Sequence, residues 1–390
     1  MNAQRSFYLI VIVVAQFAGV SLWFAGNGVL HDLITDFNLP ASTLGHLTSA
    51  VQLGFIAGTF FYSLFAFADR HSPTLVFLIS AMLAALCSLS LIVSNGDSLI
   101  IYGSRFLTGF FLAGIYPVGM KIAADHFDKD LGKALGYLLG ALVLGTALPH
   151  LLRNQLDAYP WQNVIKITSA IAILGAVILF FTVPNGPFRR KQTGKRKWIV
   201  AHLFQDKEFS KAAFGYFGHM WELYAFWAFV PFMIPLFISV HNPADISLLS
   251  FFIIAAGALG CIAGGYVSLR KGNRKVAMYA LAASGMCCLM SPLFFTLHPW
   301  IVFGFMLFWG VVVITDSPQF STLIANTAPI ENRASALTMV NCIGFGITII
   351  SIQLLNFLST AIPPQWLLFL LFPGPVLGLY MMVRQRNGPP

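Results

Sequence analysis

The chain has 390 residues, of which 57% are hydrophobic and only 9% are charged. A soluble domain carries roughly 25% charged residues, so this composition excludes a soluble globular protein and predicts a multi-pass membrane protein. The formal net charge of +9 does not indicate nucleic-acid binding, because the basic residues collect in short polar loops.

Twelve segments are long and apolar enough to cross a lipid bilayer, which takes about 20 residues each. The strongly polar stretch Pro184–Lys211 separates the first six from the last six. We therefore predict an N-terminal six-helix bundle at 1–183, a basic linker at 184–210 and a C-terminal six-helix bundle at 211–390. In chain order the predicted spans are 7–27, 46–67, 74–94, 98–123, 133–152, 163–183, 211–238, 247–269, 275–295, 300–325, 335–358 and 365–383.

The Lys and Arg residues are distributed unevenly between the two sides of the predicted bundle. Nineteen of the 23 fall on the side of both termini, three lie within spans, and only Arg153 lies on the opposite side. Because basic loops stay in the cytoplasm, we expect both termini there. The short loops are typical of a protein of the bacterial cytoplasmic membrane, and no cleavable signal peptide is evident.

The two halves of the sequence repeat each other. HFDKDLGKALG, with Lys133, matches TAPIENRASAL, with Arg333, at an offset of 200 positions. Pro117 and Pro318 interrupt corresponding spans. Six plus six helices with matching loops indicate two parallel half-repeats around a central cavity. The five cysteines show no metal-ligand spacing, so we expect no metal and no cofactor.

Two motifs point to a known family. The connection from Gly58 to Arg70 reads GTFFYSLFAFADR, its second-half counterpart reads GGYVSLRKGNRK, and the fourth span contains RFLTGFFLAG with Arg105. These resemble the gating-loop and helix-four motifs of the major facilitator superfamily. The first copy lacks the second glycine and later basic residues, and the second copy lacks the Asp. The resemblance covers almost the whole chain and implies an all-α fold of two pseudo-symmetric six-helix bundles that transports solutes.

Two further phrases, YPVGMKIAADHF and TDSPQFSTLIA, resemble the bacterial nitrate/cyanate-like branch of that family. Nitrate porters are expected to carry an arginine in helices two and eight. Neither span has one here, which disfavours nitrate itself.

Few ionisable residues lie deep inside the predicted spans, and each is a functional candidate because burying it in a bilayer is costly. Glu222 is predicted near the midplane of the seventh span, with His219 one turn earlier on the same face, so the two could share a proton. Asp316 lies two residues before Pro318 in the tenth span. The resemblance implies proton coupling or helix packing for Arg105. The alternative for both carboxylates is a structural ion pair or hydrogen bond between helices.

The polar and aromatic residues of the spans that line the cavity in the resembled fold are candidate substrate-binding residues. They are Trp23, Asn27, Gln52, Trp221, Tyr224, Gln319 and Asn341. Asp69 and Arg70 are expected to act as a gate that pairs in one conformation and opens in another. Pro231 and Pro235 are expected to break the seventh helix.

The intramembrane cations lie in the first half, and the carboxylates and His219 lie in the second. A cavity with one basic and one acidic wall suits an anionic or zwitterionic solute. We therefore expect a monomeric, proton-coupled symporter of a small polar solute that works by alternating access. The alternatives are a proton-driven exporter of drugs or metabolites and, in another class, a non-transporting membrane sensor. No catalytic motif indicates an enzyme.

Overall fold

The computed structural model describes residues 3–127, 131–189, 201–238, 240, 242–329 and 333–384. Within these ranges the chain is helical without strands, which confirms the predicted all-α class. The basic run from Arg190 to Lys197, on which the linker prediction depends, lies outside the described residues.

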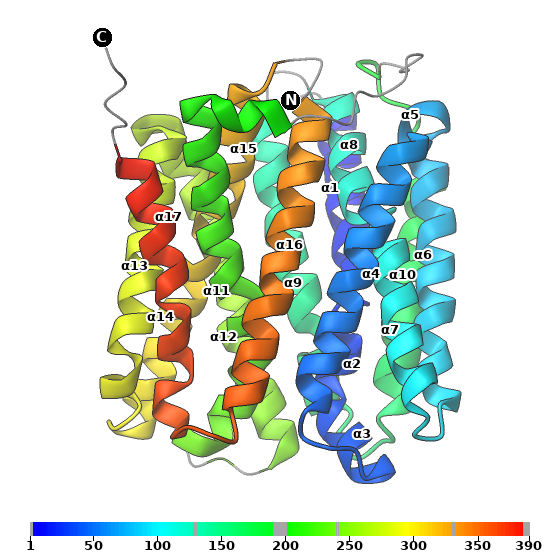
Figure 1. The fold of residues 1–390 in the computed structure, drawn as a ribbon. Coiled ribbons are helices and arrows are strands. Elements are labelled where there is room, and N and C mark those ends of the chain that lie inside the picture. The colour runs from blue at the N-terminus through cyan, green and yellow to red at the C-terminus, as the bar shows by residue number, and fades with distance from the viewer. Residues whose placement is uncertain are drawn as a thin grey trace.

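The first half of the chain forms one group of helices (Figure 1). Its elements are α1 (Ala3–Val20), α2 (Ala25–Gly28), α3 (Leu30–Phe37), α4 (Thr43–Phe65), α5 (Phe67–Arg70), α6 (Pro73–Leu89), η1 (Ser90–Val93), α7 (Ser98–Leu112), α8 (Tyr116–His126), α9 (Leu131–Gln155) and α10 (Gln162–Thr182). We call this group the N-bundle.

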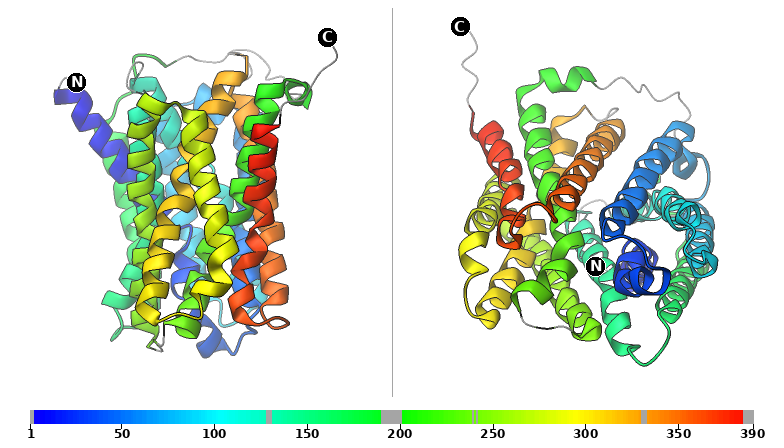
Figure 2. Two further views of the ribbon diagram at one scale, coloured as in Figure 1. Left: turned by 90° about the vertical axis from the view of Figure 1, so that its left-hand side faces the viewer. Right: turned by 60° about the horizontal axis from the view of Figure 1, so that its bottom comes forward.

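The second half forms the C-bundle beside it (Figure 2). Its elements are η2 (Ala201–Gln205), α11 (Lys207–Phe237), α12 (Pro243–Lys271), α13 (Asn273–Phe294), α14 (Pro299–Thr315), α15 (Ser317–Thr327), α16 (Arg333–Leu358), η3 (Pro364–Trp366), η4 (Leu368–Leu371) and α17 (Pro373–Val383). In the described part of the chain, 11 helical segments are long and apolar enough to span a membrane, and Gln4–Val20 is a shorter apolar helix. These twelve correspond to the twelve predicted spans.

The start of α1 and the end of α17 lie at the same end of the molecule, which we call the terminal end (Figure 1). The opposite end is the distal end. The two bundles meet where α9 packs along α12 and where α4 packs against α16. Inside the N-bundle, α4 and α7 approach so closely that a Cβ atom on Gly54 would overlap the Phe106 carbonyl. The absence of a side chain there lets the two backbones touch.

Two corresponding helices are interrupted, as the prolines predict. The fourth span divides into α7 and α8, and the tenth divides into α14 and α15. Pro117 is the second residue of α8, and Pro318 is the second residue of α15. Proline is tolerated there because the first turn of a helix needs no N–H donor.

Two expectations about helix breaks are wrong. The first span was expected to be one helix, but it ends at Val20 and resumes at Ala25. The seventh was expected to break at Pro231 and Pro235, but α11 continues through both to Phe237. A proline removes only one N–H donor, and packing by neighbouring helices can hold the remaining turns together.

Candidate functional site

The break in the first span is held by a buried cation. Arg105 of α7 donates a hydrogen bond from Nη1 to the Leu22 carbonyl at 3.2 Å and another from Nη2 to the Trp23 carbonyl. Its side chain is fully buried. Leaving a helix frees backbone carbonyls that lipid cannot satisfy, and the guanidinium supplies the missing donors. Arg105 therefore stabilises the non-helical backbone between α1 and α2.

Side chains on α4 face this break. The Asn27 amide donates to Thr48 Oγ1 at 2.8 Å, which ties α2 to α4. Gln52 lies one turn further along the same face of α4, and Phe55 lies almost another turn on. Gln52 is fully buried, and neither polar atom of its side chain has a hydrogen-bond partner among the described residues.

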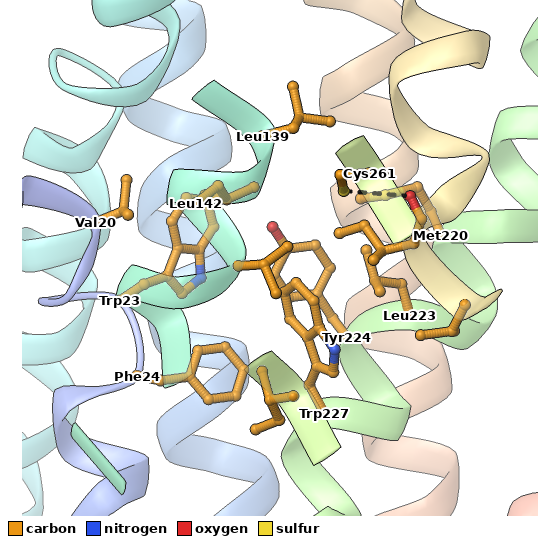
Figure 3. Packing of buried hydrophobic residues seen from close by; sticks show 14 of the residues in the cluster. Val20, Trp23, Phe24, Leu139, Leu142, Met220, Leu223, Tyr224, Trp227 and Cys261 are labelled. Atoms are coloured by element: carbon orange, nitrogen blue, oxygen red, sulfur yellow. Dashed lines mark hydrogen bonds between the residues drawn. The ribbon is translucent and has the colours of Figure 1, made fainter. Parts of the chain in front are cut away.

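Five aromatic side chains from both bundles meet in the middle of the molecule. We call Trp23, Phe55, Tyr224, Trp227 and Phe345 the central aromatic cluster. The centroid of the Trp23 ring lies 4.6 Å from that of Phe55, 5.7 Å from that of Tyr224 and 5.6 Å from that of Phe345. Tyr224 in turn contacts Trp227 at 5.4 Å. Figure 3 shows Trp23 and Tyr224 facing one another from opposite sides. The cluster therefore fills the centre of the boundary between the bundles.

Several polar atoms around this cluster are buried without a partner. The indole nitrogens of Trp23 and Trp227 and the amide nitrogen of Gln52 are donors in this condition, considering only residues that the structure describes. The Asn27 and Gln52 side-chain oxygens are the corresponding acceptors. Buried polar groups are normally hydrogen-bonded, so a concentration of unpartnered ones is unusual and is expected at a binding site.

A second polar site lies inside the C-bundle at the break of the tenth span. His219 Nδ1 of α11 lies 2.8 Å from Oδ1 of Asp316, and both side chains are 1% exposed. His219 was expected to share a proton with Glu222. Its described partner is instead Asp316, which the interruption between α14 and α15 places beside it.

Glu222 has partners of its own. Its Oε1 accepts from the Trp309 indole at 2.6 Å, and its Oε2 accepts from the Ser284 hydroxyl at 2.9 Å. Two residues later on α11, about 200° around the helix axis, Tyr224 faces the N-bundle. Glu222 therefore faces the interior of the C-bundle.

The expected cavity with one basic and one acidic wall is not what the structure shows. Arg105 bonds the backbone of its own bundle, and Glu222 bonds side chains of its own bundle. Sequence spacing identified both as buried but not the direction in which each points, because that depends on the packing of neighbouring helices.

Two other candidate substrate residues, Trp221 and Gln319, lie apart from the cluster, and a third, Asn341, lies on the same helix as Phe345. Trp221 donates from its indole nitrogen to the Leu370 carbonyl at 3.4 Å, which directs it to η4 and away from the centre. Gln319 is buried and lines a pocket of about 230 Å³ near the terminal end, between α9, α12 and α15. Asn341 is partly buried on α16, one turn before Phe345.

The candidate gate residues lie at the terminal end of the N-bundle. Lys121 Nζ of α8 lies 3.3 Å from Oδ1 of Asp69 and 3.3 Å from Oδ1 of Asp125. Asp69 follows a turn in which Ala66 adopts a left-handed backbone conformation (φ 49°). Arg70 is exposed. Of these two ion pairs, the one with Asp69 joins α5 to α8 and the one with Asp125 lies within α8, so both stay inside the N-bundle.

At the distal end the bundles are bonded to each other. Gln353 of α16 donates to Ser49 Oγ at 2.8 Å, and Asn356 donates to the Ser42 carbonyl at 3.3 Å. From there α4 and α16 diverge toward the terminal end (Figures 1 and 2). These contacts close the distal end along α4 and α16.

Sequence reasoning did not identify several of these residues. Phe55 and Phe345 complete the aromatic cluster, and Ser284 and Trp309 bind Glu222. The spacing of Thr48, Gln52 and Phe55 on one face of α4 was a usable signal for Phe55. Ser284 and Trp309 gave none, because each is an ordinary residue of an apolar span until its neighbours are known.

The comparisons with known proteins agree with this architecture. The family model described as Major Facilitator Superfamily matches residues 11–381. A putative uncharacterized transporter of Escherichia coli (strain K12), YgaY, is 27% identical over 187 residues, 47% of this chain and 46% of that protein.

Two other relatives have more specific names. A bicyclomycin resistance protein homolog of Haemophilus influenzae is 22% identical over 258 residues, 63% of this chain and 62% of that protein. The nitrite extrusion protein of Bacillus subtilis is 24% identical over 288 residues, 70% of this chain and 69% of that protein. The chain thus spans about half to two-thirds of the length of the curated relatives it matches. Because the family model covers almost all of the sequence, the chain belongs to the Major Facilitator Superfamily.

Proposed function

We propose that this chain is a secondary active transporter of a small solute rich in hydrogen-bond acceptors, such as an organic anion, in symport with protons. The observation that carries this proposal is the group of unpartnered buried donors on Trp23, Trp227 and Gln52. They lie around a break in a membrane helix, at the boundary between two bundles. A solute with acceptor oxygens would satisfy these donors, and burial would make each hydrogen bond stronger than in water.

Alternating access would then be a rocking of residues 1–183 against residues 211–390. The distal bonds of α16 with Ser42 and Ser49 would hold one conformation closed, and the Asp69–Lys121 ion pair would stabilise the terminal end of the N-bundle. The uneven distribution of Lys and Arg favours the terminal end as the cytoplasmic one, in a bacterial cytoplasmic membrane.

Proton coupling is assigned to the contact between His219 and Asp316. Both groups can take up a proton, and both are buried where an uncompensated charge is costly. The contact lies at a helix break, so a change in its protonation can act on the bend between α14 and α15. Glu222 is assigned a structural role, because two donors hold its carboxyl group.

A second candidate is a proton-driven exporter of drugs or metabolites. The central aromatic cluster favours it, because aromatic side chains can pack against varied apolar molecules. The named relative from Haemophilus influenzae, a bicyclomycin resistance protein homolog, supports the same candidate.

The test is proton movement in proteoliposomes that contain an internal pH dye, with anionic, zwitterionic and cationic solutes added outside. We expect organic anions to acidify the interior. Asp316→Asn should lower that acidification at least about tenfold while solute exchange between the two sides continues. Glu222→Gln is the matched control, and acidification by this variant should stay within about twofold of wild type.

Two results would overturn the proposal. One is acidification that requires a cationic solute, and the other is coupled transport that Asp316→Asn leaves unchanged. Alkalinisation of the interior by apolar drugs would favour the exporter instead.

A further inference from the structure

Two nearly parallel rings from opposite bundles face each other at the centre of the molecule. The planes of Trp23 and Tyr224 differ by 27°, and their ring centroids are 5.7 Å apart. Figure 3 shows the two side chains reaching toward each other from different parts of the chain. Trp23 has a similar relation to Phe345, at 26° and 5.6 Å. Trp23 is fully buried and Tyr224 is 3% exposed. A flat aromatic surface of the N-bundle is thus stacked against one of the C-bundle.

The supports of these two rings are independent of each other. Trp23 belongs to the non-helical segment between α1 and α2, and its carbonyl is held by Arg105. Tyr224 belongs to the uninterrupted helix α11. A relative movement of the two bundles therefore changes the distance between the rings without breaking a helix.

The space that such a movement must create is small. Stacked rings are favourable from a centroid distance of about 4.5 Å, so a third ring between two others needs roughly 9 Å. The observed distance is 5.7 Å. A separation of about 3 Å is therefore enough to admit one planar ring, whereas a molecule with a thick saturated ring needs more and gains no stacking.

The polar atoms around the rings favour a negatively charged solute over a positively charged one. Two donors have no partner among the described residues: the indole nitrogen of Trp227, within the cluster, and the amide nitrogen of Gln52, on α4 three residues before Phe55. Aromatic rings also attract cations, and the unpartnered oxygens of Asn27 and Gln52 are acceptors, but neither oxygen carries the negative charge that a buried ammonium group requires. The carboxyl groups of Glu222 and Asp316, by contrast, have partners within the C-bundle. A solute with a carboxylate suits these donors better than one with an ammonium group.

We propose that the solute is a planar aromatic or heteroaromatic carboxylate. Its ring is held between Trp23 and Tyr224, and its carboxylate accepts hydrogen bonds from Gln52 and Trp227. In the solute-free protein the two rings stack on each other and occlude the centre. This inference rests on the proposed transport function and adds the class of its solute.

The test compares three probes of similar size: benzoate, cyclohexanecarboxylate and benzylammonium. Calorimetry on the purified full-length chain in detergent gives affinities, and the proteoliposome assay gives coupled uptake. We expect benzoate to bind at least about fivefold more tightly than cyclohexanecarboxylate, from stacking on two rings. We expect no measurable binding of benzylammonium.

The variants separate stacking from folding. Trp23→Leu should abolish the preference for benzoate, so that benzoate and cyclohexanecarboxylate bind with about equal affinity. Trp23→Phe, which keeps an aromatic face, should retain most of the preference. Trp300→Leu is the matched control, because Trp300 is 67% exposed on α14 and should not alter the preference.

The outcomes distinguish this inference from the function on which it rests. Coupled uptake of carboxylates without a preference for the planar ring would overturn the proposal that the solute ring is held between Trp23 and Tyr224. It would not contradict the proposed symport. Binding of benzylammonium in place of benzoate would overturn the carboxylate class. If no carboxylate is bound or taken up, both proposals fail.

Discussion

The two bundles interrupt corresponding helices, the fourth and the tenth spans, but the buried charged side chains of these helices have different partners. In the N-bundle the fourth span is interrupted before Pro117, and its fully buried cation, Arg105 of α7, bonds backbone carbonyls at the break of the first span. In the C-bundle the tenth span is interrupted before Pro318, and its charged residue, Asp316, contacts the side chain of His219.

The two charged side chains differ in whether they can gain or lose a proton. An arginine keeps its proton at all accessible pH values, so its bonds to carbonyls are permanent parts of the structure. A carboxyl group beside an imidazole can exchange a proton, and its interaction then changes. Corresponding helices thus carry a permanently charged side chain in one bundle and a protonatable side chain in the other.

The largest expected effect comes from removing the permanently charged side chain. Arg105→Met leaves the Leu22 and Trp23 carbonyls without their donor inside the bundle. Hydrogen bonds from charged donors contribute about 1.5–3 kcal/mol each. We expect the free energy of unfolding, measured by chemical unfolding in mixed micelles, to fall by about 3 kcal/mol or more, and transport to be lost.

The control is Lys166→Met, which removes an exposed cation from α10. Its unfolding should match that of wild type. If Arg105→Met unfolded like wild type while only proton coupling changed, Arg105 would belong with the protonatable groups, and the contrast between the bundles would be lost.

A smaller effect is expected at the structural carboxyl group of the C-bundle. Trp309→Phe removes the donor that lies 2.6 Å from Glu222 Oε1 and preserves most of the ring. We expect a loss of about 1.5 kcal/mol in the free energy of unfolding. Anion-driven acidification in proteoliposomes should stay within about twofold, because Asp316 is untouched.

Trp300→Phe serves as the matched control for this measurement, because its side chain is exposed. Loss of proton coupling in a stable Trp309→Phe protein would contradict the structural role of Glu222. Glu222 would then be a second proton-coupling carboxylate, as the sequence suggested.

The smallest effect is expected where the bundles meet. Gln353→Leu removes the 2.8 Å bond to Ser49 that helps to close the distal end. One such bond contributes about 1 kcal/mol, so the open population at that end should rise about fivefold. The rate at which a cysteine introduced by Ser42→Cys reacts with a membrane-impermeant maleimide measures this population.

Gln155→Leu is the control, because Gln155 is an exposed glutamine at the last position of α9, at the distal end of the molecule. An unchanged reaction rate in Gln353→Leu would show that packing of α4 on α16, and not this hydrogen bond, keeps the distal end closed.

The membrane spans could be predicted from the sequence because lipid restricts the possible backbone structures. A bilayer permits only segments that satisfy their own backbone hydrogen bonds, so the apolar runs had to be helices. The predicted span 247–269, for example, corresponds to α12, Pro243–Lys271. Pro117 and Pro318 likewise marked two breaks correctly, because proline lacks an N–H donor and is favoured in the first turn of a new helix. Pro231 and Pro235 show that a proline does not decide a break by itself, because α11 continues through both.

The break in the first span could not be predicted, because its cause is not in the local sequence. Ser21–Phe24 contains no proline and no glycine, so nothing local forbids a helix there. The helix can end because Arg105, more than 80 positions away, satisfies the carbonyls that the break exposes. The sequence of the first span alone does not indicate that Arg105 is its hydrogen-bonding partner.

The sequence by itself therefore determined the class of protein, its twelve spans and the burial of Arg105, His219, Glu222 and Asp316 in them. Hydropathy and helical periodicity are properties of single segments, and they suffice for those conclusions. Only the tertiary structure decided that His219 meets Asp316, that Glu222 meets Trp309 and Ser284, and that Trp23 stacks on Tyr224. Periodicity tells which face of a helix a residue occupies, but the neighbour of that face is chosen by the packing of all the helices together.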